Sequence, residues 1–142
     1  MTQHSPDATT AFTRYIAAFN AGDFETACSY YADDIRLTIG SGRELRGREE
    51  IVRFYTGVRG VTRRTITVLD CFASETLLAA ELESEFLAVT DIPDFTSGPM
   101  RQGDRMYINS FVFYDIDRGR FSRIRATVFQ RVWKRRDDPV SR

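Results

Sequence analysis

Histidine and cysteine are almost absent from this chain of 142 residues. His4 is its one histidine and stands near the N-terminus, and Cys28 and Cys71 are its two cysteines. A zinc site of histidine and cysteine therefore lacks ligands, and a Ser-His-Asp or Cys-His triad would need His4 to reach in from a tail. Two cysteines make no disulfide framework, so we expect both to be buried free thiols. No metal and no other cofactor is predicted.

Long hydrophobic runs and a surplus of either charge are also missing. No run of about eighteen apolar residues is present, which excludes a membrane-spanning helix, and the opening MTQHSPDATT holds no apolar segment of a signal peptide. We therefore expect a cytoplasmic protein. The 20 basic residues balance 20 acidic ones, so no net field attracts nucleic acid or an anionic membrane. The short basic clusters Arg63-Arg64 and 134–136 are interpreted as solvated surface.

Apolar and aromatic residues are plentiful. They make up 42% and 13% of the chain, with 11 Phe and 6 Tyr, which predicts a packed core rather than disorder. The length suits one domain over residues 1–142. Residues 1–8 and 134–142 are polar and charged, and we expect them to be tails.

The periodicity of the apolar residues changes along the chain. Helical spacing recurs three times in the first 58 residues, and from Thr62 onward the pattern is that of strands. The order predicts an α+β fold with three N-terminal helices on one face of a curved antiparallel sheet. The stripes of the three helices are Phe12–Phe19, Phe24–Tyr31 and Ile51–Val58; the strands are Ile35–Ile39, Thr62–Phe72, Leu77–Val89, Arg105–Asp115 and Phe121–Trp133, with a turn at GSGREL and a loop over Asp91–Asp104.

Strand alternation divides the sheet into two faces. In Leu77–Val89 three glutamates share one face, which must be solvent or an interface because stacked carboxylates cannot stay unpaired in a core. The inner face is then Ala80, Leu82, Ser84 and Phe86. Both faces of Arg105–Asp115 are largely apolar, so we expect one to line a cavity and the other to form a homodimer interface. We place Tyr107, Asn109, Phe111 and Phe113 on the cavity side.

Tyrosines interrupt the apolar stripes. Tyr15, Tyr31 and Tyr55 each fall on the apolar side of one predicted helix, and a buried phenol needs a hydrogen-bond partner. The three can bond to one another and present one hydroxyl to a ligand. Alternatively, they are ordinary core tyrosines with backbone or water partners.

A family resemblance bears on this choice. The segment from AFTRYIAAFNAGDF to GREEIVRFY resembles the opening of the ketosteroid isomerase branch of the nuclear transport factor two-like superfamily, most specifically in RYIAAFNAGD, YYADD and IVRFY. The later segment INSFVFYDIDRGRFSRIRATVF is similar to the last hairpin of that family. The resemblance implies a cone of three helices against a curved mixed or antiparallel sheet, an apolar pocket and a homodimer.

The resemblance also implies site residues. The oxyanion-hole tyrosine of the family falls on Tyr15, two tyrosines behind it fall on Tyr31 and Tyr55, and the second hydrogen-bond donor falls on Asn109. Donors of this kind stabilise a developing enolate. The general base of the family falls on Ile39, which cannot take a proton, so a standard steroid isomerase is not expected.

Other branches of the superfamily fit less well. The epoxide hydrolase pattern needs an arginine and two aspartates in the pocket, the dehydratase pattern needs histidines, and the cyclase pattern needs an inward acidic residue, and none is expected here. The long loop TDIPDFTSGPMR resembles a lid. Its Asp94, or the neighbouring Asp91 or Asp104, can supply a carboxylate, although solvated loop acids are the simpler interpretation.

Three functions remain open from the sequence. The favoured one is an isomerase-type or lyase-type enzyme acting on an apolar carbonyl or hydroxylated compound. The alternatives are a binder of an apolar metabolite and a dimeric module whose pocket is packed shut by phenylalanines. We expect a neutral interior for an uncharged ligand, lined by Phe19, Ile39, Phe54, Leu82, Ser84, Phe86, Tyr107, Phe111, Phe113, Ala126 and Val128.

Overall fold

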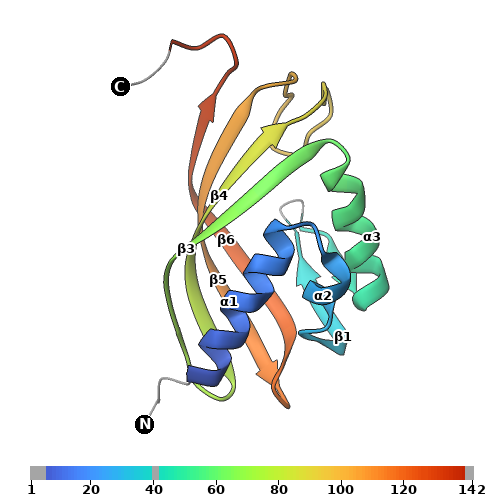
Figure 1. The fold of residues 1–142 in the computed structure, drawn as a ribbon, viewed down its shortest axis with the longest axis vertical. Helices are drawn as coiled ribbons and strands as arrows, with labels where there is room; N and C mark the ends of the chain where they lie inside the picture. The colour runs from blue at the N-terminus through green and yellow to red at the C-terminus, as the bar shows by residue number, and fades with distance from the viewer. Residues whose placement is uncertain (1–5, 40–41, 140–142) are drawn as a thin grey trace.

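In the part of the chain that the structure describes, three helices and six strands make up the fold (Figure 1). The computed structural model describes residues 6–39 and 42–139. In chain order the elements are α1 Pro6–Asn20, α2 Phe24–Cys28, β1 Tyr31–Thr38, β2 Glu44–Arg46, α3 Arg48–Arg59, β3 Thr62–Ala73, β4 Leu77–Ala88, β5 Arg105–Asp117 and β6 Arg120–Lys134. Within these described residues, none of the helices has the length and apolarity that crossing a membrane requires.

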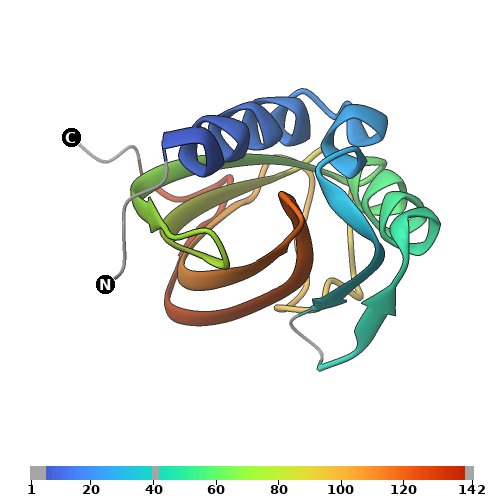
Figure 2. The same cartoon turned by 90° about the horizontal axis from the view of Figure 1, so that it is seen from below.

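The sheet is mixed and strongly curved. Its strand order is β2-β1-β6-β5-β4-β3, with β1 parallel to β6 and all other neighbours antiparallel. Figure 2 shows the sheet curling beneath α1, with α3 beside the β1 end. The α+β cone with helices on one side of the sheet is therefore confirmed, and the sheet does not close.

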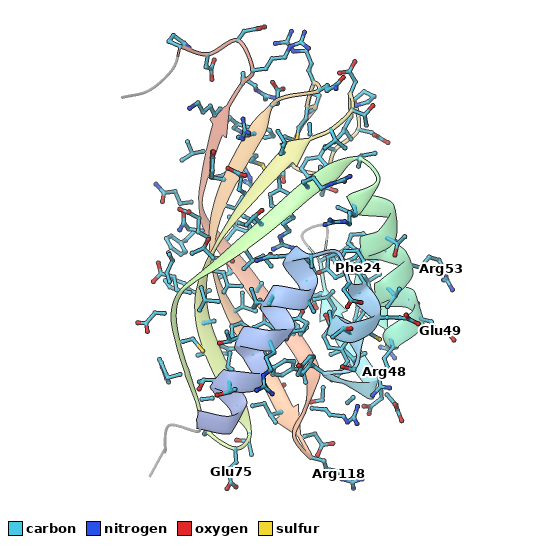
Figure 3. All side chains as sticks on the ribbon, viewed as in Figure 1. Phe24, Arg48, Glu49, Arg53, Glu75 and Arg118 are labelled. Atoms are coloured by element: carbon cyan, nitrogen blue, oxygen red, sulfur yellow. The ribbon has the colours of Figure 1, made fainter. Side chains whose placement is uncertain are left out.

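The helices pack through the stripes that the sequence predicts. Phe12, Tyr15 and Phe19 of α1 are all buried, and α3 buries Ile51. Figure 3 shows Glu49 and Arg53 projecting from α3 away from the sheet. An apolar stripe facing inward and a charged face outward is what holds a surface helix on its sheet.

Two predicted boundaries are wrong. The second helix ends at Cys28, so Tyr31 is the first residue of strand β1 rather than part of a helical stripe. The Asp23 carboxylate caps this short helix by accepting from the Thr26 backbone N–H at 3.2 Å, but Ser29 and Tyr30 already form a turn. In addition, part of the expected GSGREL turn is strand β2, whose Leu45 pairs with β1 and is fully buried; Gly40 and Ser41 lie outside the described residues.

The expected tails are partly structured. Helix α1 begins at Pro6, inside the expected 1–8 tail, and residues 1–5 lie outside the described part of the chain. At the other end, Lys134 belongs to β6. The next residues bind Asp104, which is buried at the end of the long loop: it accepts from the Arg136 backbone N–H at 2.8 Å and pairs with the Arg135 guanidinium at 3.1 Å. The C-terminal segment thus ties down the loop; residues 140–142 are not described.

The two faces of β5 are the reverse of the prediction. Phe111 and Phe113 are 49% and 45% exposed, on the outer side of the sheet, whereas Ser110, Val112 and Tyr114 are buried. The register explains this: Leu82 of β4 lies opposite Ser110, and directly paired residues project to the same face. Because the inner face of β4 is correctly predicted, its partners on β5 must be the even-numbered residues. The same parity places Tyr107 and Asn109 on the outer face.

Candidate functional site

A cavity of about 580 Å³ lies between the helices and the curved sheet. Helices α1 and α3 contribute Phe19 and Phe54, and Phe24, labelled in Figure 3, comes from α2. The volume falls in the range of small-molecule sites, and most of the lining is apolar as such sites require. The expectation of a pocket packed shut by phenylalanines is therefore not met, since Phe111 and Phe113 lie outside the cone.

Two tyrosines are hydrogen-bonded at the wall of the cavity. Tyr15 lines the cavity, and its hydroxyl is 2.7 Å from the hydroxyl of Tyr31, which lies behind it. Either phenol can be the donor. Tyr31 is held in turn by Arg48 at the start of α3, whose Nε donates to the Tyr31 carbonyl at 3.0 Å. This arrangement fixes the Tyr15 hydroxyl at the boundary between core and cavity.

Burial keeps both phenols protonated. The pKa of Tyr15 is raised well above 10, first by burial and then by the neighbouring Tyr31 and Tyr55. Burial likewise raises the pKa of Tyr31 well above 10. Both tyrosines are therefore neutral hydrogen-bond donors at any physiological pH. When Tyr31 donates to Tyr15, the proton of Tyr15 is free to point into the cavity.

Two more tyrosines border the cavity. Tyr55 packs edge-on against Phe19 with ring centroids 4.8 Å apart. Burial raises its pKa, while the charge and a hydrogen bond of Arg64 lower it in part. Tyr114, from β5, also lines the cavity, and burial is the main reason that its pKa is raised. Of the three tyrosines that the resemblance implies as site residues, the structure places Tyr15 and Tyr55 at one cavity and Tyr31 behind Tyr15.

An arginine also reaches into the cavity. Arg64 on β3 lines it, and its Nη2 and Nε lie 3.1 and 3.3 Å from the Ser84 hydroxyl. Its guanidinium stands 5.5 and 5.0 Å from the ring centres of Phe19 and Phe86. The interpretation of Arg63-Arg64 as solvated surface is therefore wrong for Arg64. Its side chain shares a face of β3 with buried Thr62 and Ile66. This alternation was the signal in the sequence that Arg64 faces inward.

The structure places most of the predicted lining residues at the cavity, but four of them, and Asn109, lie elsewhere. Ser84 is fully buried and binds Arg64 rather than facing the cavity. Tyr107, Asn109, Phe111 and Phe113 lie on the outer face, for the register reason given above, so Asn109 does not supply a second donor. The predicted residues that do line the cavity are Tyr15, Phe19, Ile39, Phe54, Tyr55, Leu82, Phe86, Ala126 and Val128.

The long loop reaches the cavity without its acids. Phe95, Thr96 and Ser97 border the cavity, whereas Asp94 is exposed and is not part of the lining. The loop is folded back by a bridge between Ile92 and Met100, and this bridge directs Phe95 onto Phe86 at 5.9 Å between ring centres. Asp94 is therefore no candidate for a general base in this arrangement.

The charged side chains of the described lining are all positive. Among the described residues, the charged side chains that line the cavity are Arg59, Arg64 and Arg131, and no aspartate, glutamate or histidine joins them. Ile39 occupies the position where the resemblance places a base, and it lines the cavity. The prediction of a neutral interior is thus wrong, because arginines line the cavity. The lining can offer a ligand hydrogen bonds from phenols, from guanidinium groups and from serine and threonine hydroxyls.

Comparison with known proteins identifies relatives of this fold. A family model described as "SnoaL-like domain" matches residues 12–124. No curated protein sequence is significantly similar to the chain.

Several solved structures share the fold at low sequence identity. A SnoaL-like polyketide cyclase from Agrobacterium tumefaciens superposes with a TM-score of 0.71 at 17% identity, covering 87% of this chain and 91% of that one. An LEH-like epoxide hydrolase from M. tuberculosis gives 0.69 at 15%, covering 87% and 83%. A computationally designed 17-OHP binder gives 0.70 at 18%, covering 93% and 100%. At these identities the likeness concerns the fold.

Proposed function

The chain belongs to the SnoaL-like domain family, and we propose that it is a small-molecule enzyme that stabilises the enolate of a largely apolar carbonyl compound. Tyr15 is the proposed hydrogen-bond donor to the carbonyl oxygen. Tyr31 holds Tyr15 in place, and Tyr55 is the proposed second phenol beside the substrate. The reaction classes that such a site serves are isomerisation, dehydration, ring closure and retro-aldol cleavage.

The observation that carries this proposal is the buried phenol pair at the cavity wall. The Tyr15 and Tyr31 hydroxyls lie 2.7 Å apart, and only Tyr15 lines the cavity. With Tyr31 donating to Tyr15, the Tyr15 proton is directed at a ligand oxygen. As negative charge develops on that oxygen, the hydrogen bond strengthens because the surroundings are apolar and already organised.

The absence of a carboxylate from the described cavity lining restricts the reaction. A proton that leaves carbon must pass to water or to the substrate itself, so the substrate must have an acidic C–H bond. A methylene group beside a carbonyl and an aromatic ring, or between two carbonyls, meets this need. A shuttle that carries one proton between two carbons is not supported, since Ile39 stands at the position of the base.

Proton exchange on a simple ketone tests the proposal. 2-Tetralone has an apolar two-ring body and an acidic methylene, and loss of its C1 protons in D₂O is followed by ¹H NMR. The protein should accelerate exchange, and Tyr15→Phe should slow the protein-dependent rate by on the order of a hundredfold, the usual effect of losing one oxyanion donor. Tyr30→Phe is the matched control, because the Tyr30 ring lies 6.1 Å from Tyr15 but is not part of the lining.

A binding measurement beside the exchange assay separates catalysis from simple binding. 2-Naphthol, an enol-like two-ring probe, should bind to the wild type more tightly than its methyl ether does. Binding of 2-naphthol with no exchange of 2-tetralone above the buffer rate favours a non-catalytic binder; a computationally designed 17-OHP binder is among the proteins with a similar fold. Unchanged exchange in Tyr15→Phe refutes the role of Tyr15.

A further inference from the structure

The position of Arg64 in the fold is fixed from both sides. Two residues further along β3, Ile66 exchanges two hydrogen bonds with the Asn20 amide at the end of α1: Asn20 accepts from the Ile66 N–H at 2.8 Å and donates to the Ile66 carbonyl at 3.0 Å. Thr62, two residues earlier, donates its hydroxyl to the Val58 carbonyl of α3 at 3.1 Å. Arg64 therefore stands on a strand segment fastened to two helices, and its side chain enters the cavity between them.

The guanidinium is positioned by neutral groups. Nε and Nη2 of Arg64 both approach one acceptor, the Ser84 hydroxyl, and the rings of Phe19 and Phe86 lie within cation–π range of it. Such packing orients the planar group at the cavity wall. Ser84 is fully buried, so this contact belongs to the interior and not to a solvated surface.

The charge of Arg64 has no counter-ion in the described part of the protein. The ion pairs found there join other arginines to carboxylates, and Arg59 and Arg131 add positive charge to the same lining. A half-buried cation among aromatic rings is costly unless an anion accompanies it. A bidentate oxygen anion is the partner that a guanidinium matches best.

We propose that the cavity takes an amphipathic anion, a molecule with an apolar ring body and one carboxylate or ionised enol group, and that Arg64 binds that group. This inference deepens the proposed function, on which it rests for the presence of a small-molecule ligand, and it replaces the uncharged ligand expected from the sequence. Arg64 is then a substrate-binding residue, and Tyr55 beside it donates a second hydrogen bond to the same group or to its neighbour.

A pair of matched probes tests the charge preference. 2-Naphthoate and 2-naphthamide have the same ring body and almost the same shape, but only the first is an anion at pH 8. Calorimetric titration of the wild type should show naphthoate binding more tightly by on the order of tenfold or more, the usual gain from a charge-assisted hydrogen bond. Arg64→Met should abolish this preference while naphthamide binding persists, and the persistence shows that the cavity still folds.

Two further variants sharpen the result. Arg64→Lys keeps the positive charge but loses the planar guanidinium that binds a carboxylate through two nitrogens, and it should retain part of the preference for naphthoate. Arg63→Met is the matched control, because Arg63 is exposed, donates to the Arg59 backbone carbonyl and is not one of the residues that line the cavity. It should leave both affinities unchanged. The preference should also largely survive 0.5 M NaCl, since contact pairs inside a cavity are screened much less than surface pairs.

The outcomes separate this inference from the proposed function. A naphthoate preference that survives Arg64→Met, or equal or absent binding of both probes to the wild type, overturns the inference, whatever the exchange of 2-tetralone shows. If naphthoate binds through Arg64 but the wild type does not accelerate exchange, the inference stands and the enzymatic proposal fails.

Discussion

The hydrogen bond between Tyr15 and Tyr31 predicts a strong energetic coupling between the two residues. Each phenol is almost completely buried, at 4% and 2% exposure, and the 2.7 Å contact between their hydroxyls is the hydrogen bond that the structure shows for either side chain within the described residues. We therefore consider the two single variants, Tyr15→Phe and Tyr31→Phe, together with the double variant. The difference between their effects isolates the pair.

The single variants should differ in cost. Tyr15→Phe leaves the Tyr31 hydroxyl buried with no partner, which costs about 1–3 kcal/mol of the free energy of unfolding. Tyr31→Phe leaves the Tyr15 hydroxyl at the cavity wall, where water can hydrate it, so we expect a smaller cost of about 1 kcal/mol. In the double variant both hydroxyls are gone and neither is stranded. Its cost should be less than the sum of the singles by about 1–2 kcal/mol.

Urea unfolding followed by circular dichroism measures these quantities. The midpoint should move while the slope m stays constant, since the surface exposed on unfolding hardly changes. Tyr30→Phe provides the background for removing a half-buried hydroxyl that is outside the pair. Single-variant costs that add to within about 0.5 kcal/mol would refute the coupling. A larger cost for Tyr31→Phe than for Tyr15→Phe would refute the assignment of Tyr15 to the cavity side.

Two other predictions concern the loop and the outer face. Burial would raise the pKa of Asp104, but hydrogen bonds from the Arg101 and Arg136 backbones and from Arg135 bring it from 3.8 to about 2. The carboxylate therefore stabilises the fold above pH 4, by about 2 kcal/mol, and this contribution is lost as the pH falls through 2. Asp104→Asn should destabilise the protein at pH 7, and in thermal unfolding its difference from the wild type should become much smaller as the pH is lowered from 4 to 2. An equal effect at pH 7 and pH 2 would contradict this. On the outer face, Phe113 is exposed beside Phe111, and we predict that this face joins two copies of the chain. Phe113→Glu should then convert a dimer to a monomer, as measured by size-exclusion chromatography with light scattering. A monomeric wild type would exclude the interface.

The sequence determined the elements and much of the site. Helical spacing located the stripes of α1 and α3, and strict alternation identified the inner face of β4 correctly, because Glu81 and Glu83 cannot share a core with Leu82. The family resemblance added the phenol group of Tyr15, Tyr31 and Tyr55. These features are local, or they are carried by short motifs, so one sequence suffices to find them.

Local sequence patterns could not predict the short elements or the two faces of β5. Five helical residues of α2 are too few for a periodic signal, so the end of the helix and the start of β1 at Tyr31 were misplaced. On β5 both parities are apolar, and hydrophobicity alone cannot tell them apart. Only the register with β4, which sets Ser110 opposite Leu82, decides that Asn109 faces outward.

By itself, then, the sequence determined that three helices cover one side of a sheet and that the phenols of Tyr15 and Tyr55 border the interior. The tertiary structure alone decided the charge of that interior. Arg64 has the same chemistry in the sequence as exposed Arg63, and it differs because the pleat of β3 turns it inward, onto Ser84 and between two phenylalanine rings. Whether a charge is solvated or held in a cavity depends on contacts between distant residues, and these exist only after the chain has folded.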